Sequence, residues 1–257
     1  MPLLSSILKD YLAPTAAVIA VILSQLPPIK TWLKKKKPLV TVGRFLSVTH
    51  FIGQPELQLY VSILNDSHSS IRIHNIEVVL TKFGKDKISL PVFSIFERTD
   101  NNLQKAFSPF TLKSDSEWSH TLRFYAPLDG SEEQNFKKLF YSLKNNISDL
   151  ITENNKKEDS ERLDLVEADN DIVEKFKDIY HLKRFWENAE YKLQLNVTTD
   201  SPSTSFQAEY DFFLSMPDVE FLESVIERYK YGSSILITDT NVFATVIVRH
   251  KNSALLS

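Results

Sequence analysis

Residues 57–80, LQLYVSILNDSHSSIRIHNIEVVL, decide the fold class of this chain. In their first part, apolar residues alternate with polar or aromatic ones, at Leu57, Leu59, Val61 and Ile63. This period of two is typical of a half-buried β-strand. The Asn-Asp-Ser-His-Ser stretch that follows is rich in turn-forming residues. The isoleucines and valines after it then predict a further strand or strand pair, so the domain is expected to be built on a β-sheet.

Similar alternation on both sides of this stretch predicts more strands. They are expected at residues 40–48, 88–93, 118–126, 191–199, 204–214 and 235–248, the last as a strand or a hairpin. Pro91 lacks a backbone N–H, and this favours an edge position for the strand that contains it. Strand regions therefore occur in both the first and the last third of the chain.

The region between these two groups of strands is predicted to be helical. Ser131–Gln134 resembles a capping box, and apolar residues recur at helical spacing after it. A second apolar stripe covers residues 172–180, and the acidic stretch 153–169 reads as an exposed linker, ordered or disordered. A third helix is expected between Pro217 and Gly232, which suit the start and the end of a helix.

Residues 57–80, with their Leu-x-Leu-x-Val and Ile-x-Ile-x-x-Ile-x-Val patterns, resemble the opening strands of immunoglobulin-like β-sandwich domains. The resemblance is greatest to such domains in uncharacterised bacterial membrane-anchored proteins. It covers about fifty residues, and it implies a binding or scaffolding module without catalytic residues. We therefore expect a mainly β fold, an Ig-like β-sandwich at 38–257 with a helical insertion at about 131–187.

The N-terminal 37 residues are predicted to form a membrane anchor. No charged residue occurs from Tyr11 to Ile29, which is nineteen positions. A helix of that length is about 28 Å long and matches the ~30 Å hydrocarbon core of a bilayer. A cleaved signal peptide or a buried core helix are the alternatives, but the basic cluster follows the apolar run, and a signal peptide has its basic residues first.

Eight residues are assigned to this anchor. Lysines lie just beyond the apolar run, and they predict an N-terminus outside the cell and a cytoplasmic C-terminal domain. Trp32 supplies an interfacial ring, and small residues four positions apart share one helix face, through which the helix is expected to self-associate or bind another membrane protein. The anchor set is Ala16, Ala20, Ser24, Trp32, Lys34, Lys35, Lys36 and Lys37.

Composition and motifs point away from several chemistries. The chain has no cysteine, which excludes disulfides, thiolate metal sites and a cysteine nucleophile. Its five glycines are scattered, so no phosphate-binding loop can be written. The net charge of −3 gives no global attraction to nucleic acid. We therefore expect no cofactor, no bound metal and no nucleic-acid partner.

The function expected from these observations is that of a non-enzymatic, single-pass membrane-anchored interaction, scaffold or sensor protein. One alternative is an enzyme whose site assembles from dispersed residues such as His74, His120, Glu97 and Asp211. Carboxylates and histidines with shifted pKa values, gathered in one pocket, would favour the enzyme. Another alternative is an exported, surface-facing binding domain.

Overall fold

The computed structural model describes residues 15, 18, 20, 21, 37–82, 84, 86–97, 104–237 and 242–250. Most of the predicted anchor Tyr11–Ile29 lies outside these residues, although residues 15, 18, 20 and 21 are helical and exposed. Within the described parts of the chain, no helix is long and apolar enough to cross a bilayer. Ala20 and Lys37 are described and exposed, whereas the other residues assigned to the anchor lie outside: Ala16, Ser24, Trp32, Lys34, Lys35 and Lys36.

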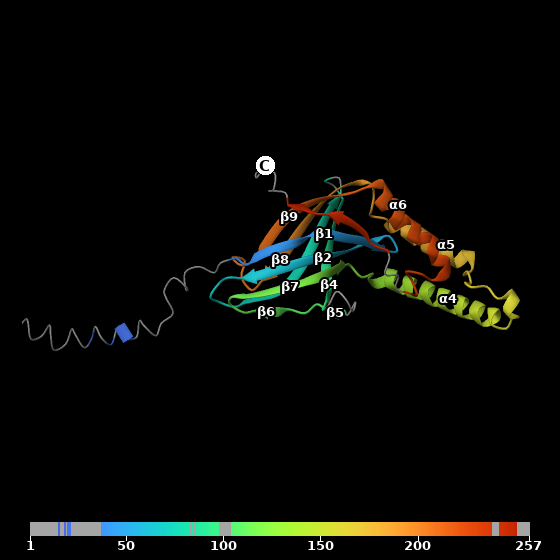
Figure 1. Ribbon diagram of the computed structural model, residues 1–257, viewed down its shortest axis with the longest axis horizontal. Coiled ribbons are helices and arrows are strands. Elements are labelled where there is room, and N and C mark those ends of the chain that lie inside the picture. The colour runs from blue at the N-terminus through green and yellow to red at the C-terminus, as the bar shows by residue number, and fades with distance from the viewer. Residues whose placement is uncertain are drawn as a thin grey trace, which may run out of the picture.

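The fold is mainly β, as predicted, and every named strand pair is antiparallel (Figure 1). The strands run in the order β10-β1-β2-β7-β4-β3-β8-β9-β11, with β5 beside β4 and β6 beside β3. Their bounds are β1 (Leu39–Phe51), β2 (Gln54–Asn65), β3 (Ile71–Lys82), β4 (Asp86–Phe96), β5 (Gln104–Ala106), β6 (Phe110–Leu112), β7 (Ser116–Tyr125), β8 (Ala189–Thr199), β9 (Phe206–Leu214), β10 (Ala244–Ile247) and β11 (Arg249–His250).

The sheet is nearly closed because β10 and β11, which only Val248 separates, lie at opposite ends of the strand order. Its interior is filled by the alternating apolar residues that the sequence pattern singled out. Leu57, Leu59, Val61 and Ile63 of β2 are completely buried. The period-two pattern therefore identified the inward face of this strand correctly.

Strand β4 lies inside the sheet, so the predicted edge position is wrong. Its first half pairs with β3 as far as Pro91, and its second half pairs with β7 from Val92 onward. Pro91 lies where the strand changes partners, and a missing N–H is tolerated at such an irregular point. The proline thus marks a crossover between two parts of the sheet.

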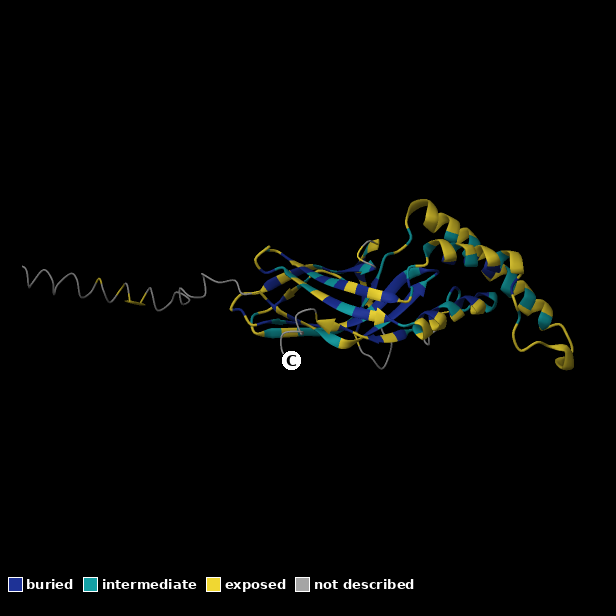
Figure 2. Ribbon diagram, turned by 90° about the horizontal axis from the view of Figure 1, so that it is seen from above, coloured by how far each residue is buried: buried dark blue, intermediate teal, exposed yellow. Residues whose placement is uncertain are grey.

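The helices gather at one end of the sheet, opposite the end at which β1 begins (Figure 1). They are α4 (Gly130–Asn154), α5 (Asn170–Lys183) and α6 (Met216–Ser224), with the 3₁₀ helices η2 (Asp159–Glu161) and η3 (Val225–Tyr231). We call this group the helical cap. It has its own apolar core, which includes Leu143, Val173, Phe176, Val225 and Tyr229. Figure 2 shows how much of α4 remains exposed, and Leu143 is its one buried residue.

Helix positions match the sequence prediction better than helix ends do. The α4 helix starts at Gly130 with Asp129 as N-cap and no side-chain cap hydrogen bond, so the capping box predicted at Ser131–Gln134 is wrong. A capping box does form at α6, between Ser215 and Asp218. Gly232, with a φ of 73°, ends the third helical segment as predicted.

Two further expectations need correction. Residues 153–169 are largely exposed, as predicted, but the last two residues of α4 and the η2 turn lie within them. The Asn154 side chain also donates to the carbonyl of Leu163 and accepts from its N–H, so this stretch is an ordered turn. Of the strand predicted at 235–248, Ile235 and Leu236 form a turn after Gly232, Ile237 forms a single bridge to Ser233, and the first strand that the described residues show after it is β10, from Ala244.

The β1–β2 hairpin joins the sheet to the cap. Its two turn residues, Ile52 and Gly53, have φ values of 47° and 87°, the positive values that suit a two-residue hairpin. A positive φ is unfavourable for a β-branched residue, yet Ile52 is buried in the core of the cap. A Cβ on Gly53 would lie 2.6 Å from the carbonyl oxygen of Tyr180, so this position requires glycine.

Candidate functional site

The two edges of the sheet meet at a seam formed by the C-terminal strand segment. Its first part, β10, pairs with β1 from Val48 to Phe45, and its second part, β11, pairs with Asp211 and Tyr210 of β9. On the α6 side of Val248, β10 and β9 have no strand pairing with each other. We call this unpaired interval between Phe212–Leu214 and Ala244–Ile247 the seam.

The direction of the backbone groups in the seam follows from one hydrogen bond. The N–H of Val248 donates to the carbonyl of Arg44 on β1, at 2.9 Å. Because N–H and C=O groups of successive residues in an antiparallel strand point to opposite sides, Ala244 and Val246 also face β1. The backbone groups of Thr245 and Ile247 therefore face the seam, where the described residues offer them no strand partner.

The same argument applies to the other side of the seam. Arg249 lies opposite Asp211, so the backbone groups of Asp211 face β11. Two residues further along β9, the backbone groups of Phe213 point in the same direction, away from β8. Three residues thus direct backbone donors and acceptors into the seam from its two sides.

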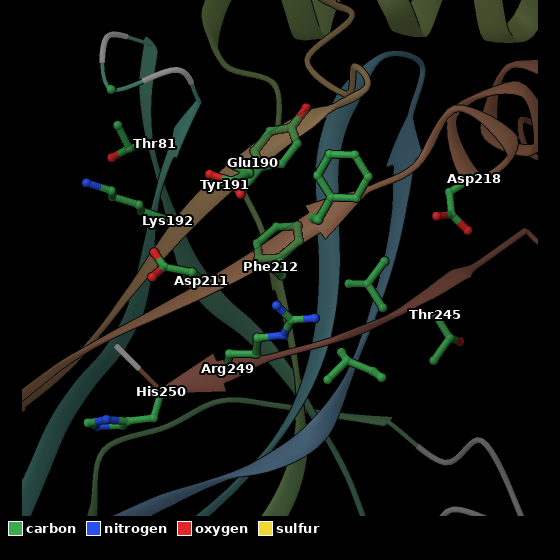
Figure 3. A pocket seen from close by; sticks show the side chains of 14 residues that line it. Thr81, Glu190, Tyr191, Lys192, Asp211, Phe212, Asp218, Thr245, Arg249 and His250 are labelled. Carbon is green, nitrogen blue, oxygen red and sulfur yellow. The ribbon is translucent and has the colours of Figure 1, made fainter. Parts of the chain in front are cut away.

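An open cleft of about 880 Å³ covers the seam and the neighbouring outer face (Figure 3). Tyr191 and Phe212 belong to the strands beneath it, and their rings are buried in the core of the sheet, where they stack at a centroid distance of 5.2 Å and an interplanar angle of 10°. Phe213 and Ile247 also line it, with exposed fractions of 54% and 45%. Large apolar side chains at this exposure favour contact with a ligand or partner.

The charged side chains of the cleft are distributed unevenly. At the closed end of the seam, Lys192 of β8, Asp211 of β9 and Arg249 of β11 lie opposite one another in adjacent strands. At the open end, Glu190 lies opposite Phe213, and Asp218 belongs to the first turn of α6. The cleft therefore has two cations around one carboxylate at its closed end and two carboxylates at its open end.

A second candidate site, inside the cap, is better explained as a structural joint. The Nε2 atom of His50 lies 2.9 Å from the carbonyl oxygen of Leu222 in α6, and its Nδ1 accepts from the N–H of Gly53. These partners fit a neutral ring with the proton on Nε2. Burial lowers the pKa of His50, opposed by the hydrogen bond to Leu222, so the imidazole is held neutral.

Two tyrosines complete this joint. The ring of Tyr180 lies 4.9 Å from that of His50, and burial raises the pKa of Tyr180 to about 12. Burial also raises the pKa of Tyr229, whose hydroxyl has no hydrogen-bond partner in the part of the chain that the structure describes. Phenols that resist ionisation in this way are typical of packed aromatic residues rather than of acid–base catalysts.

The structure does not bring together the four residues of the dispersed-enzyme alternative. The Nδ1 atom of His120 on β7 donates to the carbonyl oxygen of Phe96, and the adjacent Glu97 forms an ion pair with Lys105. Asp211 lies on β9, four strands away from β7 in the sheet order, and His74 is exposed on β3. Among the described residues, no group of three or more histidines and carboxylates is placed to hold a metal ion.

Sequence reasoning missed the seam residues Phe213, Thr245, Ile247 and Arg249. The alternation in residues 235–248 predicts a strand or a hairpin that includes Thr245 and Ile247, and Arg249 lies just beyond it. The pattern does not reveal that one strand segment pairs with both edges of the sheet, because one of its two partners, β1, lies at the other end of the sequence. Asp211 was named, but for a different role.

Comparisons with known proteins add little to this description. No protein-family model matches the chain, and no curated protein matches it. A protein from Archaeoglobus fulgidus with a crystal structure is similar at 10% sequence identity and a TM-score of 0.28. The match covers 69% of this chain and 97% of that one. A likeness at this level carries no argument about fold or function.

Proposed function

We propose that this chain is a non-enzymatic, single-pass membrane-anchored binding protein whose β domain faces the cytoplasm. In this proposal the segment Tyr11–Ile29 spans the bilayer, and the lysines at 34–37 hold its end on the cytoplasmic side. The β domain is then a variant of the immunoglobulin-like sandwich, in which β4 and the C-terminal strand each pass from one sheet to the other. Its role is to bind a cytoplasmic partner close to the membrane.

The observation that carries the proposal is the position of the seam relative to the start of β1. Leu39 follows Lys37 by only two residues, so β1 begins where the predicted anchor ends. Val48, which pairs with Ala244 at the open end of the seam, is nine residues further on, or about 30 Å along the strand. An anchor at residues 11–29 thus leaves the seam and the cap accessible from the cytoplasm.

Binding fits the cleft better than catalysis does. Its charged side chains alternate in sign along the outer face of the sheet, and Lys192 and Arg249 are exposed to solvent. Its apolar part is formed by the exposed side chains of Phe213 and Ile247. Such a surface suits recognition of a partner through apolar contacts and charge pairing.

Alkaline carbonate extraction tests the membrane part of this proposal. The full-length chain is expected to stay in the membrane pellet, because a spanning helix is not released by high pH. A truncated chain beginning at residue 38 is the matched control and is expected in the supernatant. Release of the full-length chain by carbonate would contradict the anchor.

The anchor is also proposed to self-associate through Ala16, Ala20 and Ser24, which allow close helix approach. Replacing Ala16 and Ala20 by isoleucine is expected to abolish the signal in a membrane two-hybrid reporter. Isoleucine at Val18 and Val21 keeps the hydrophobicity while leaving the small residues in place, and it is expected to preserve the signal. Equal signals from both variants would remove this part of the proposal.

A further inference from the structure

We propose that two copies of this chain pack face to face through a row of exposed apolar side chains on the outer face of the sheet. The row consists of Tyr60 on β2, Phe45 on β1, Ile247 on β10 and Phe213 on β9, and we call it the apolar row. The inference rests on the proposed function, because it requires both copies to be anchored in one bilayer. It names a second copy of this chain as a partner of the binding surface.

The first half of the apolar row crosses β2, β1 and β10. Phe45 and Ile247 lie directly opposite each other in the β1–β10 pair. Tyr60 lies beside the bulge of β1, where a Cβ on Gly43 would be 3.1 Å from the Cβ of Tyr60. Tyr60 and Phe45 have exposed fractions of 45% and 59%, so both rings stand on the solvent side of the sheet.

The second half of the apolar row crosses the seam to β9. Arg249 lies opposite Asp211. Two residues nearer the open end, Ile247 and Phe213 therefore lie across the seam from each other, and both line the cleft. Four neighbouring strands thus each contribute one large exposed apolar side chain. Single exposed apolar residues are ordinary, but a contiguous group of them marks an interaction surface.

Uncharged side chains flank the apolar row along the strands. On one side of the row, Ser47 of β1 lies between Thr245 of β10 and Gln58 of β2. On the other side, Thr41 of β1 lies opposite Ser62 of β2. Packed sheets are about 10 Å apart, and this spacing requires that no long charged side chain stands between them. A second sheet can therefore approach the row without burying a charge at these five positions.

The size of the surface fits a dimer that is held partly by its anchors. The four side chains of the row expose roughly 400 Å² of mostly apolar surface. A standard interface buries about 800 Å² on each partner, so the flanking residues and the exposed Leu39 of β1 have to supply the rest. Two anchors that associate in one bilayer raise the effective concentration of the domains, and a modest interface is then sufficient.

The shared bilayer fixes the orientation of the two copies. Chains with the same topology are related by a two-fold axis along the bilayer normal, and β1 starts only two residues after Lys37. The β1 strands of both copies therefore lead away from the membrane in the same direction. Face-to-face packing then requires an axis parallel to the strands, between β1 and β10. An axis along the row would place the two anchors at opposite ends of the dimer.

This axis determines which side chains meet. Phe45 packs on Ile247 of the partner subunit, and Tyr60 packs on Phe213 of the partner subunit. Because the order of the row is reversed in the second copy, every contact occurs twice, as in any isologous interface. The contact at the centre of the row therefore joins two residues that are different within one chain, and this makes the orientation testable by exchanging charges.

Cysteine cross-linking tests the inference with the full-length chain in membranes. The chain has no native cysteine, so a short bismaleimide joins two copies of Thr245→Cys only where this residue, next to the proposed axis, meets the partner subunit. On this background, Phe45→Asp or Ile247→Lys alone should lower cross-linking at least about tenfold, because each buries two unpaired charges. The double variant should regain the parent level, since each carboxylate then faces an ammonium group of the partner subunit.

Ser89→Cys is the matched control for cross-linking. Ser89 is exposed on β4, four strands from β10 in the sheet order, and it should cross-link at least about tenfold less than Thr245→Cys. Equal cross-linking at both positions would overturn the inference, and so would a double variant that stays as low as the single ones. If Phe45→Asp alters the sheet, Tyr60→Lys with Phe213→Asp repeats the exchange at the end of the row.

Failure of this inference is distinguishable from failure of the proposed function. If the chain resists carbonate extraction while Thr245→Cys cross-links no more than Ser89→Cys, the dimer is wrong and the membrane anchor stands. Release of the chain by carbonate counts against the proposed function itself.

Discussion

The sheet and the helical cap both enclose an apolar core, but they are held together in different ways. The strands of the sheet pair over most of their length, so each buried residue is supported by hydrogen bonds on both sides. The cap packs helices around a hairpin tip, at which Ile52 enters its core and Gly53 touches α5. The stability of the cap therefore depends on a few close contacts, whereas the stability of the sheet is distributed over many strand pairings.

The largest expected effect compares one phenylalanine from each core. Phe124 lies inside the sheet and Phe176 inside the cap, and both are completely buried. Replacement by alanine should cost about 3–5 kcal/mol of unfolding free energy in either case, because each leaves a cavity. Amide exchange separates the two: Phe176→Ala should expose α4 and α5 while β3 and β8 stay protected, and Phe124→Ala should weaken protection everywhere. Uniform loss of protection in Phe176→Ala would contradict the separation of the two cores.

The next largest effect concerns the hairpin tip. Gly53→Ala places a methyl group 2.6 Å from the carbonyl oxygen of Tyr180 and within a backbone of φ 87°, so it should cost about 2–4 kcal/mol in a urea unfolding experiment. Gly84→Ala is the matched control, since its φ is also positive but no atom lies within 4 Å. It should cost only about 1 kcal/mol. Equal losses of unfolding free energy in the two variants would show that close packing against α5 does not constrain the hairpin tip.

Removing the hydroxyl from each of two buried tyrosines should change the free energy of unfolding by a smaller amount, and in opposite directions. The Tyr191 hydroxyl accepts from the N–H of Glu187 at 2.7 Å and donates to its carbonyl at 3.0 Å, so Tyr191→Phe should lose about 1–2 kcal/mol. The Tyr229 hydroxyl has no partner among the described residues, and Tyr229→Phe should gain about 1 kcal/mol because an unsatisfied polar group is removed. A destabilised Tyr229→Phe variant would reveal a hydrogen bond at that hydroxyl.

The smallest expected effect is a dependence of cap stability on pH. Burial lowers the pKa of His50 in the folded protein below its ordinary value of 6.5. The unfolded chain therefore binds more protons between these two pKa values, so stability is full above pH 6.5 and declines as the pH falls toward the folded pKa. His50→Gln keeps a donor to Leu222 and should remove this part of the decline in thermal melts. An unchanged pH profile would assign the decline to other groups.

The strands of the sheet were largely predictable because their signal is local. Alternation in residues 57–63 and 191–199 reports directly which side chains face inward. The hairpin joint was not predictable, because the partner of Gly53 is the backbone of α5, more than a hundred residues away. A glycine between two strands looks the same in the sequence whether its turn is solvated or packed.

The candidate site was predictable to a smaller degree. Phe213 and Ile247 read as ordinary strand residues, and their exposure becomes visible only when the two sheet edges are placed side by side. Pro91 misled the edge assignment for the same reason, since a strand that changes partners has no separate signature in its own residues. Local patterns thus reveal strands, whereas edges and seams depend on the complete order of the sheet.

The most direct test of the central claim is the accessibility of a single cysteine introduced at Ser160, in the exposed η2 turn of the cap. The chain has no native cysteine, so a membrane-impermeant maleimide reports on this position alone. A membrane-tethered domain facing the cytoplasm predicts no labelling in intact cells and full labelling once the membrane is permeabilised. Labelling in intact cells would place the domain outside and contradict the account.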